Sequence, residues 1–242
     1  ELRYGVTPRL LIGLGYNYRS YFGGGMDGFI QGFHDLFNIE QQGRDEVPRN
    51  QSQMTFYDSA GNVVIDRRSA SSLQNGGISF FGKYILHNGN RLWPAISISG
   101  TVKYWTNLAD DIDIDDPIDF GLSLGLSKRW TDRWYTYFSG AFTYHVENEF
   151  LGLKFEDTIF SAVLGLEWRW RPTLSFIVQY LAIEGAVDGN FGQLSDPSQE
   201  MTMGLKWKFV DTSVLELGVI ENMINHDNSP DFGLHVMVTH QF

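Results

Sequence analysis

Charged side chains recur at alternate positions in segments whose intervening positions are apolar. Eight of them are cationic and three are acidic: Arg9, Arg19, Lys83, Lys103, Asp119, Arg129, Glu167, Arg169, Lys206, Lys208 and Glu216. If the alternation marks strands, these side chains project from one face of a sheet. On an enclosed face they must be hydrated or paired, because an unpaired buried charge is prohibitive. Hydrated cations would line a channel that prefers anions, whereas ion pairs would fill a closed interior, and the sequence leaves both open.

Catalytic and metal-binding patterns are missing from the chain. A strand can present a His and a Ser nucleophile on one face when they are two residues apart, but Ser does not follow His145, His235 or His240 at that distance. His226 and Asp227 are adjacent, so they would point in opposite directions along a strand. The 6 His lack metal-ligand spacing, and the chain has 0 Cys. We therefore predict that the protein is not an enzyme and holds no metal or cofactor.

The composition excludes several other classes of protein. The 242 residues carry 18 Lys and Arg against 29 Asp and Glu, a net charge of -11, which argues against nucleic acid as a partner. No run of roughly 18 apolar residues is present, so no transmembrane helix is expected. The start of the sequence lacks the pattern of a signal peptide. The high aromatic content, 15%, excludes a disordered chain.

Strict alternation over about ten residues is the dominant pattern and predicts membrane-spanning strands. In the segment 120–130, for example, Phe120, Leu122 and Leu124 lie on one face and Gly121 and Ser123 on the other, with Lys128 as the one exception on the apolar face. Ten segments follow the rule: 9–19, 77–86, 95–105, 120–130, 134–146, 158–170, 174–182, 201–209, 213–221 and 232–242.

The two faces favour a transmembrane barrel over a soluble sandwich. The polar face is rich in Gly, Ser and Ala, as a curved and crowded interior requires, and not in the Lys and Glu of a solvated surface. Aromatic pairs such as Tyr16 and Tyr18, or Tyr104 and Trp105, gather at segment ends and predict girdles at the membrane interfaces. Short and long connections also alternate along the chain. Together these features predict an all-β, antiparallel, up-and-down transmembrane barrel with short periplasmic turns and long extracellular loops.

The strand count predicts about twelve strands. The chain supplies eleven, namely the end of one at Leu2–Tyr4 and ten complete ones, and single-chain barrels usually have an even number. We therefore expect the first strand to lie before Glu1. The last strand ends in Phe242 and resembles the C-terminal signature that the barrel insertion machinery reads. The other expected partners are outer-membrane lipid and lipopolysaccharide, together with a small solute.

The connection 20–75 is too long to be a passive loop and forms an extracellular insertion in the single barrel 1–242. Within it, the segment 26–37 places apolar side chains at helical spacing and predicts an amphipathic helix. The stripe consists of Met26, Phe29, Ile30, Phe33 and Phe37. A small hairpin is expected over 53–67. The helix either packs on the barrel rim or in its mouth, or serves as a plug, gate or membrane-surface element.

The segment 27–37 also carries a family resemblance. Its sequence Asp-Gly-Phe-Ile-Gln-Gly-Phe-His-Asp-Leu-Phe, followed by Gly43-Arg44-Asp45 and Pro48-Arg49-Asn50, resembles a Gram-negative outer-membrane family catalogued as domain of unknown function 3187. The turn Tyr4–Arg9 and the later alternating strands fit the same family. The resemblance implies an outer-membrane barrel, and the family has no established activity to carry over.

An acidic run in the connection 107–117 is the densest cluster of one charge. It consists of Asp110, Asp111, Asp113, Asp115 and Asp116, with Asp119 just beyond. The run lacks the Gly and Glu of a calcium-binding EF-hand loop, so we expect a solvated outer loop.

Three functions follow in order of preference. The first is an outer-membrane channel for a small polar or anionic solute, gated or lined by the helix 26–37. The second is a non-conducting barrel that acts through its extracellular loops as a structural or surface-interaction protein. The third, a lipid- or peptide-modifying enzyme, needs a nucleophile–base pair that the sequence does not show.

Overall fold

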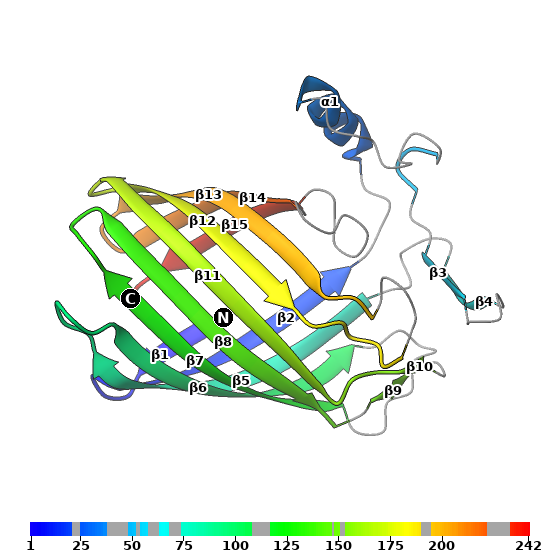
Figure 1. Cartoon of the computed structure of the whole chain (residues 1–242), viewed down its shortest axis with the longest axis horizontal. Coiled ribbons are helices and arrows are strands. Elements are labelled where there is room, and N and C mark those ends of the chain that lie inside the picture. The colour runs from blue at the N-terminus through cyan, green and yellow to red at the C-terminus, as the bar shows by residue number, and fades with distance from the viewer. Residues whose placement is uncertain are drawn as a thin grey trace.

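Eleven strands form one antiparallel sheet that curls into a barrel, and each strand pairs with the next sheet strand along the chain (Figure 1). This computed structural model describes residues 1–20, 25–37, 48–51, 54–57, 63–67, 74–107, 117–146, 148–150, 153–189, 195–221 and 233–242. The sheet strands are β1 (Leu2–Gly5), β2 (Leu10–Ser20), β5 (Gln74–Asn88), β6 (Ala95–Asn107), β7 (Ile118–Arg129), β8 (Trp134–His145), β11 (Thr158–Arg171), β12 (Leu174–Ile183), β13 (Ser198–Val210), β14 (Ser213–Glu221) and β15 (Gly233–His240). The predicted fold class is confirmed.

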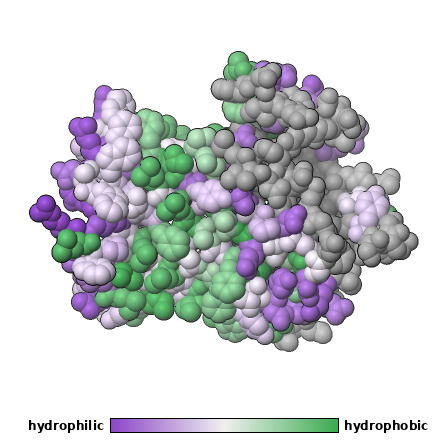
Figure 2. Space-filling model, in the orientation of Figure 1, coloured by the Kyte–Doolittle hydropathy of each residue, from purple (hydrophilic) through white to green (hydrophobic). Residues whose placement is uncertain are grey.

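The barrel keeps its apolar side chains on the outside. Only Ile30 and Val187 are buried hydrophobic residues in the described part of the chain, and neither lies in a sheet strand. Leu122, Phe160 and Leu164 project from the outer wall and are 47%, 56% and 57% exposed. Figure 2 shows the resulting apolar band across the middle of the wall, next to a hydrophilic end. A wall of this kind is suited to lipid and not to water.

Aromatic side chains concentrate near the two ends of the outer wall. At the end with short turns, Trp134, Trp168 and Phe176 stack across three neighbouring strands, with centroid separations of 6.1 and 5.4 Å. At the other end Tyr16 and Tyr104 are exposed. Such belts place amphipathic rings where a membrane meets water.

The connections differ in length at the two ends of the barrel. The turns 6–9, 89–94, 130–133, 172–173 and 211–212 join strands at one end, hereafter the turn side. The opposite, loop side carries β9 (Glu149–Phe150), β10 (Leu153–Lys154), the pair β3 (Met54–Tyr57) and β4 (Val63–Arg67), and the helix α1 (Asp27–Phe37) (Figure 1). No helix among the described residues is long and apolar enough to cross a membrane.

The two edge strands of the sheet, β1 and β15, run in the same direction. β1 pairs only with Leu11–Leu14 of β2, and β15 pairs with β14. The described residues contain no ladder between β1 and β15. The sheet therefore has eleven strands as predicted, and the twelfth strand remains a prediction.

Lys128, the charged exception on the apolar face of the segment 120–130, reaches the neighbouring turn. Its Nζ donates hydrogen bonds to the backbone carbonyls of Asn90 at 3.0 Å and Arg91 at 2.8 Å. The long side chain thus carries its charge to the polar end of the wall, which explains why the outer face tolerates it.

Gly204 of β13 lies where two strands approach closely. A Cβ at this position would lie 2.4 Å from the backbone oxygen of Leu217, so the strands would have to move apart. We expect Gly204→Val to lower the free energy of unfolding by about 1–3 kcal/mol, measured by urea titration of the refolded barrel. Gly100→Val is the control, because a Cβ there has no atom within 4 Å. Equal stability of the two variants would contradict this packing.

Candidate functional site

The interior face of the sheet brings the predicted charged residues together in rows. Cross-strand partners share a face. One row runs through Lys103, Asp119 and His145, and another runs through Arg169, Ser175, Lys206 and Glu216. The remaining predicted residues on this face are Arg19, Lys83, Arg129, Glu167 and Lys208, while Arg9 lies in the turn before β2.

Glu167 of β11 is the most buried of the predicted interior acids. It is 2% exposed, and both carboxylate oxygens accept hydrogen bonds from neutral donors. The Tyr137 hydroxyl donates to Oε2 at 2.9 Å, and the Ser175 hydroxyl donates to Oε1 at 2.7 Å. The ammonium of Lys206 is farther away, at 3.8 Å from Oε2. Two uncharged groups therefore satisfy the carboxylate, and Lys206 compensates its charge without donating a short hydrogen bond.

Arg169 and Lys206 present their charges beside this carboxylate. The Arg169 guanidinium stacks on the ring of Tyr135, with its Cζ 4.5 Å from the centroid. Lys206 lies directly across from Glu216 of β14 in the strand register. The side chain of Lys206 is 37% exposed, against 3% for Glu167. The cation is thus far more accessible than the acid that balances it.

Asp119 of β7 repeats this arrangement near the loop side. It is 8% exposed and accepts a hydrogen bond from the indole Nε1 of Trp105 at 2.8 Å. His145 Nδ1 lies 2.8 Å from the other carboxylate oxygen. Lys103 is the register partner of Asp119 on β6, and its Nζ lies 3.1 Å from the centroid of the Trp105 ring. The nearest contacts of Asp119 are therefore the indole and the imidazole, and Lys103 lies over the aromatic ring.

Two of the predicted cations pair with acids in the turns instead. Arg129 forms an ion pair with Asp132, and Lys208 Nζ lies 2.9 Å from Asp211 Oδ1. The hydrogen bond from Lys208 lowers the pKa of Asp211, so this turn carboxylate stays ionised. These pairs are exposed, and they place Arg129 and Lys208 at the turn-side mouth rather than deep in the interior.

The partners of the two buried acids are the part of the site that sequence reasoning missed. Trp105 was expected beside Tyr104 in the outer aromatic belt, but only Tyr104 faces outward, because adjacent residues of a strand point in opposite directions. Alternation puts Tyr137, Ser175 and His145 on the polar face of their segments but predicts no role for them. Strict parity in β6 would have identified Trp105, but the partners of Glu167 depend on the strand register.

Glu200 adds an acid that the sequence analysis left out. Its register partner is Leu181, which pairs with Val163 on the same face as Glu167. The predicted strand began at Met201, whereas β13 begins at Ser198. The interior therefore holds a fourth acid, toward the loop side of Lys206 along β13.

The helix stripe is only partly buried. Ile30 is 8% exposed, Phe33 is half-buried, and Met26 and Phe29 are 40% and 59% exposed. The Met26 carbonyl accepts the first helical hydrogen bonds, and Phe37 is the last helical residue. α1 lies beyond the loop side of the barrel in Figure 1. Its role as a gate remains a prediction, and the acidic run 110–116 and the pair His226–Asp227 lie outside the described residues.

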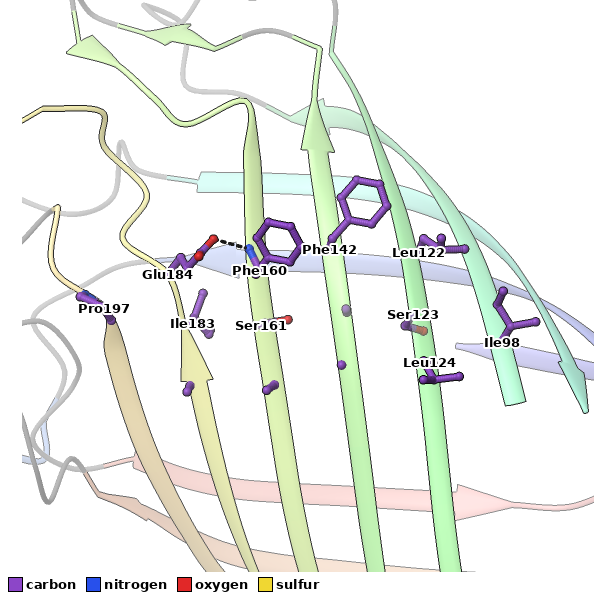
Figure 3. A pocket seen from close by; sticks show the side chains of 14 residues that line it. Ile98, Leu122, Ser123, Leu124, Phe142, Phe160, Ser161, Ile183, Glu184 and Pro197 are labelled. Atoms are coloured by element: carbon purple, nitrogen blue, oxygen red, sulfur yellow. Dashed lines mark hydrogen bonds between the residues drawn. The ribbon is translucent and has the colours of Figure 1, made fainter. Parts of the chain in front are cut away.

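The outer wall carries a shallow apolar groove of about 580 Å³ (Figure 3). Its floor is a row of small residues on neighbouring strands, Gly140, Ala162 and Ala182, and Phe142 and Phe160 form one side. At its edge the Phe160 amide donates to the Glu184 carboxylate at 2.9 Å. The strand ladders beneath are continuous, so this groove does not open into the interior.

No group of three or more His, Cys, Asp or Glu suited to a metal ion occurs among the described residues. The prediction that the protein is not an enzyme stays a prediction. The described interior is a wall with partly accessible cations, and its two buried acids, Asp119 and Glu167, accept hydrogen bonds from Trp105, Tyr137 and Ser175. Such a wall can attract and orient an anion without chemical change.

Comparisons with known proteins agree with this fold. The porin NanC, solved in a rhombohedral crystal form, gives a TM-score of 0.52 at 8% identity, covering 70% of this chain and 84% of NanC. The P. putida toluene transporter TodX gives a TM-score of 0.47 at 12% identity, covering 91% of this chain and 61% of TodX. None of the curated proteins matches the chain. At this identity, the likeness to NanC shows the barrel fold alone.

The family resemblance seen in the sequence is confirmed. The family model described as "Protein of unknown function (DUF3187)" matches residues 1–242, and the chain belongs to this family.

Proposed function

We propose that the protein is an outer-membrane channel of a Gram-negative bacterium that passes small polar or anionic solutes along the barrel axis. One observation carries the proposal: the interior acids Asp119 and Glu167 are buried and accept hydrogen bonds from an indole and two hydroxyl groups, whereas Arg19 is exposed and the Lys206 side chain is 37% exposed. On the interior face the cations outnumber the four acids Asp119, Glu167, Glu200 and Glu216, and we infer from this balance a positive field that favours the entry of anions.

The outer surface supports the proposed location. An apolar wall with aromatic residues at both ends fits contact with outer-membrane lipid and, on the loop side, lipopolysaccharide. β15 presents the exposed apolar side chains of Leu234, Val236 and Val238, and the barrel insertion machinery is the proposed partner of this strand together with Phe242. This partner is part of the proposal.

A non-conducting barrel is the alternative, and the cluster around Glu167 favours it. Tyr135, Tyr137, Arg169 and Lys206 project into the same turn-side region from three strands. If these side chains fill the cross-section, the protein acts through its extracellular loops as a structural or surface-interaction protein.

Electrical recording separates the two functions. In planar bilayers with a KCl gradient, we expect the full-length barrel to give steady conductance. We also expect its reversal potential to shift from zero toward the equilibrium potential of chloride. The positive interior is the reason, because it lowers the energy of an anion relative to a cation. Cation selectivity would overturn the anion preference, and silence of a barrel shown to be folded would favour the non-conducting alternative.

Gating by α1 is a separate part of the proposal. If the helix closes the loop-side entrance, deleting residues 26–37 will raise the fraction of time that the channel is open and leave the single-channel conductance unchanged. The readout is the open probability at fixed voltage. An unchanged open probability would remove the gate from the proposal and leave the channel intact.

A further inference from the structure

A recess of about 380 Å³ lies in the interior wall between β6, β7 and β8, directly on the turn side of the row Lys103–Asp119–His145. Sites for small molecules typically start at about 300 Å³, so the recess has room for a solute of monosaccharide size. It belongs to the interior face, because its polar lining residues share the parity of Asp119.

Small residues create this recess. Thr101, Gly121 and Thr143 are cross-strand neighbours in one row, and Ser123 and Ala141 follow in the next. A Cβ built at Gly121 would have its nearest neighbour, the Thr101 Cβ, at 3.6 Å, an ordinary contact. The space above Gly121 is therefore open and does not result from backbone strain.

The charge around the recess suits a monoanion. Lys103 lies against Gly77 of β5, where its Cε comes 2.8 Å from the position of an added Cβ. The missing side chain at Gly77 gives Lys103 room beside β5, and the charges of Asp119 and of Arg19 on β2 act on its ammonium in opposite directions. Among the Lys, Arg, Asp and Glu side chains named here, Lys103 and Arg19 stand against Asp119, which leaves a formal charge of +1. A monoanion neutralises this charge, whereas a dianion would reverse it.

The uncharged groups of the recess suit hydroxyl groups. His145 Nδ1 lies 2.8 Å from a carboxylate oxygen of Asp119, which leaves Nε2 as the ring nitrogen that can hydrogen-bond to a solute hydroxyl. The hydroxyls of Thr101, Ser123 and Thr143 can each donate and accept in the recess. The lining therefore offers hydrogen bonds in both directions next to a single positive charge.

We propose that this recess is a solute-binding site for a small monocarboxylate that carries several hydroxyl groups, with the carboxylate at Lys103 and the hydroxyls toward Thr101 and Thr143. The site deepens the proposed channel function and rests on it, since the solute enters through the barrel interior. It makes transport saturable and selective.

Calorimetric titration of the detergent-solubilised full-length barrel tests the site with gluconate as the probe. Glucose, which lacks the carboxylate, and hexanoate, which lacks the hydroxyls, are the comparison compounds. We expect gluconate to bind at least about tenfold more tightly than either, in line with the energy of a charge-assisted hydrogen bond. Lys103→Gln should weaken gluconate binding about tenfold, and Gly121→Leu should abolish it by filling the recess.

The controls keep the outcomes distinct. Lys154→Gln removes the same charge from the exposed strand β10, where Lys154 pairs with Asp188, and should leave the affinity unchanged. Gly100→Leu places the same side chain on the outer wall, where an added Cβ has no neighbour within 4 Å. Absence of gluconate binding, equal binding of hexanoate, or binding that survives both Lys103→Gln and Gly121→Leu would overturn the site. Binding by a barrel that is silent in bilayers would instead overturn the channel and keep the site.

Discussion

Replacing Lys103 and Lys206 together by Gln is expected to reduce the chloride-over-potassium permeability ratio of the channel at least about fivefold. A unit charge about 4 Å from a passing ion contributes about 1 kcal/mol in water, which corresponds to this factor. The two lysines lie near opposite ends of the interior and on different strands, so their effects should add. The permeability ratio follows from the reversal potential in a KCl gradient.

Lys154→Gln is the matched control for this experiment, because it removes a cation that is 64% exposed and lies outside the sheet. Its permeability ratio should equal that of the parent protein. The same comparison at 1 M salt should show a smaller effect of the double substitution, because the screening length falls to about 3 Å. A double variant that folds and keeps the parent's ratio would show that these lysines do not set the selectivity.

Glu167→Leu is expected to lower the free energy of unfolding by about 2 kcal/mol or more. The substitution removes the acceptor of two hydroxyl donors, Tyr137 and Ser175, and leaves Lys206 without its compensating charge. Glu167→Gln keeps one carbonyl acceptor and should cost less. Urea titration of the refolded barrel, followed by tryptophan fluorescence, gives the unfolding free energies of the parent protein and of the two variants.

Glu156→Leu makes the same chemical change at an exposed position outside the sheet strands, and it should shift the unfolding free energy by less than about 0.5 kcal/mol. If Glu167→Leu proved as stable as Glu156→Leu, the hydrogen bonds around Glu167 would not hold the barrel interior together. Comparing a Glu167→Gln/Lys206→Met double variant with the two single variants would then measure the coupling free energy between Glu167 and Lys206.

The barrel could be predicted from the sequence because its strands face two contrasting environments. Strict alternation in the segment 120–130 identifies β7 and its outward leucines, and even the exception at Lys128 falls one residue before the strand end. The same alternation identifies the inner face, because the residues between the outward-facing apolar ones must point into the barrel. Strand ends were less predictable, since β5 begins at Gln74 rather than at 77. Gly76 and Gly77 pair with β2, but glycine has no side chain that could show the alternation of apolar and polar residues.

The pairing within the interior could not be predicted in the same way. The sequence places Asp119 and Glu167 on the inner face, but which neighbours they contact depends on the strand register, and these partners are 8 to 30 residues away in the chain. Tyr137 reaches Glu167 from β8 along a diagonal, since its direct partner is Gly165. A Cβ at Gly165 would lie 3.5 Å from Tyr137 Cβ, so the tyrosine passes this position in ordinary contact. Such effects arise only once the sheet is assembled.

The near absence of buried apolar residues in the strands determines how this barrel must fold. A water-soluble domain gains its folding energy by removing apolar side chains from water into a core, but here the sheet strands contain no buried hydrophobic residue among those described. Leu122, Phe160 and Leu164 leave water only when the outer wall enters lipid. Folding and insertion are therefore one thermodynamic event, and a chain kept in water has little to gain from closing its sheet.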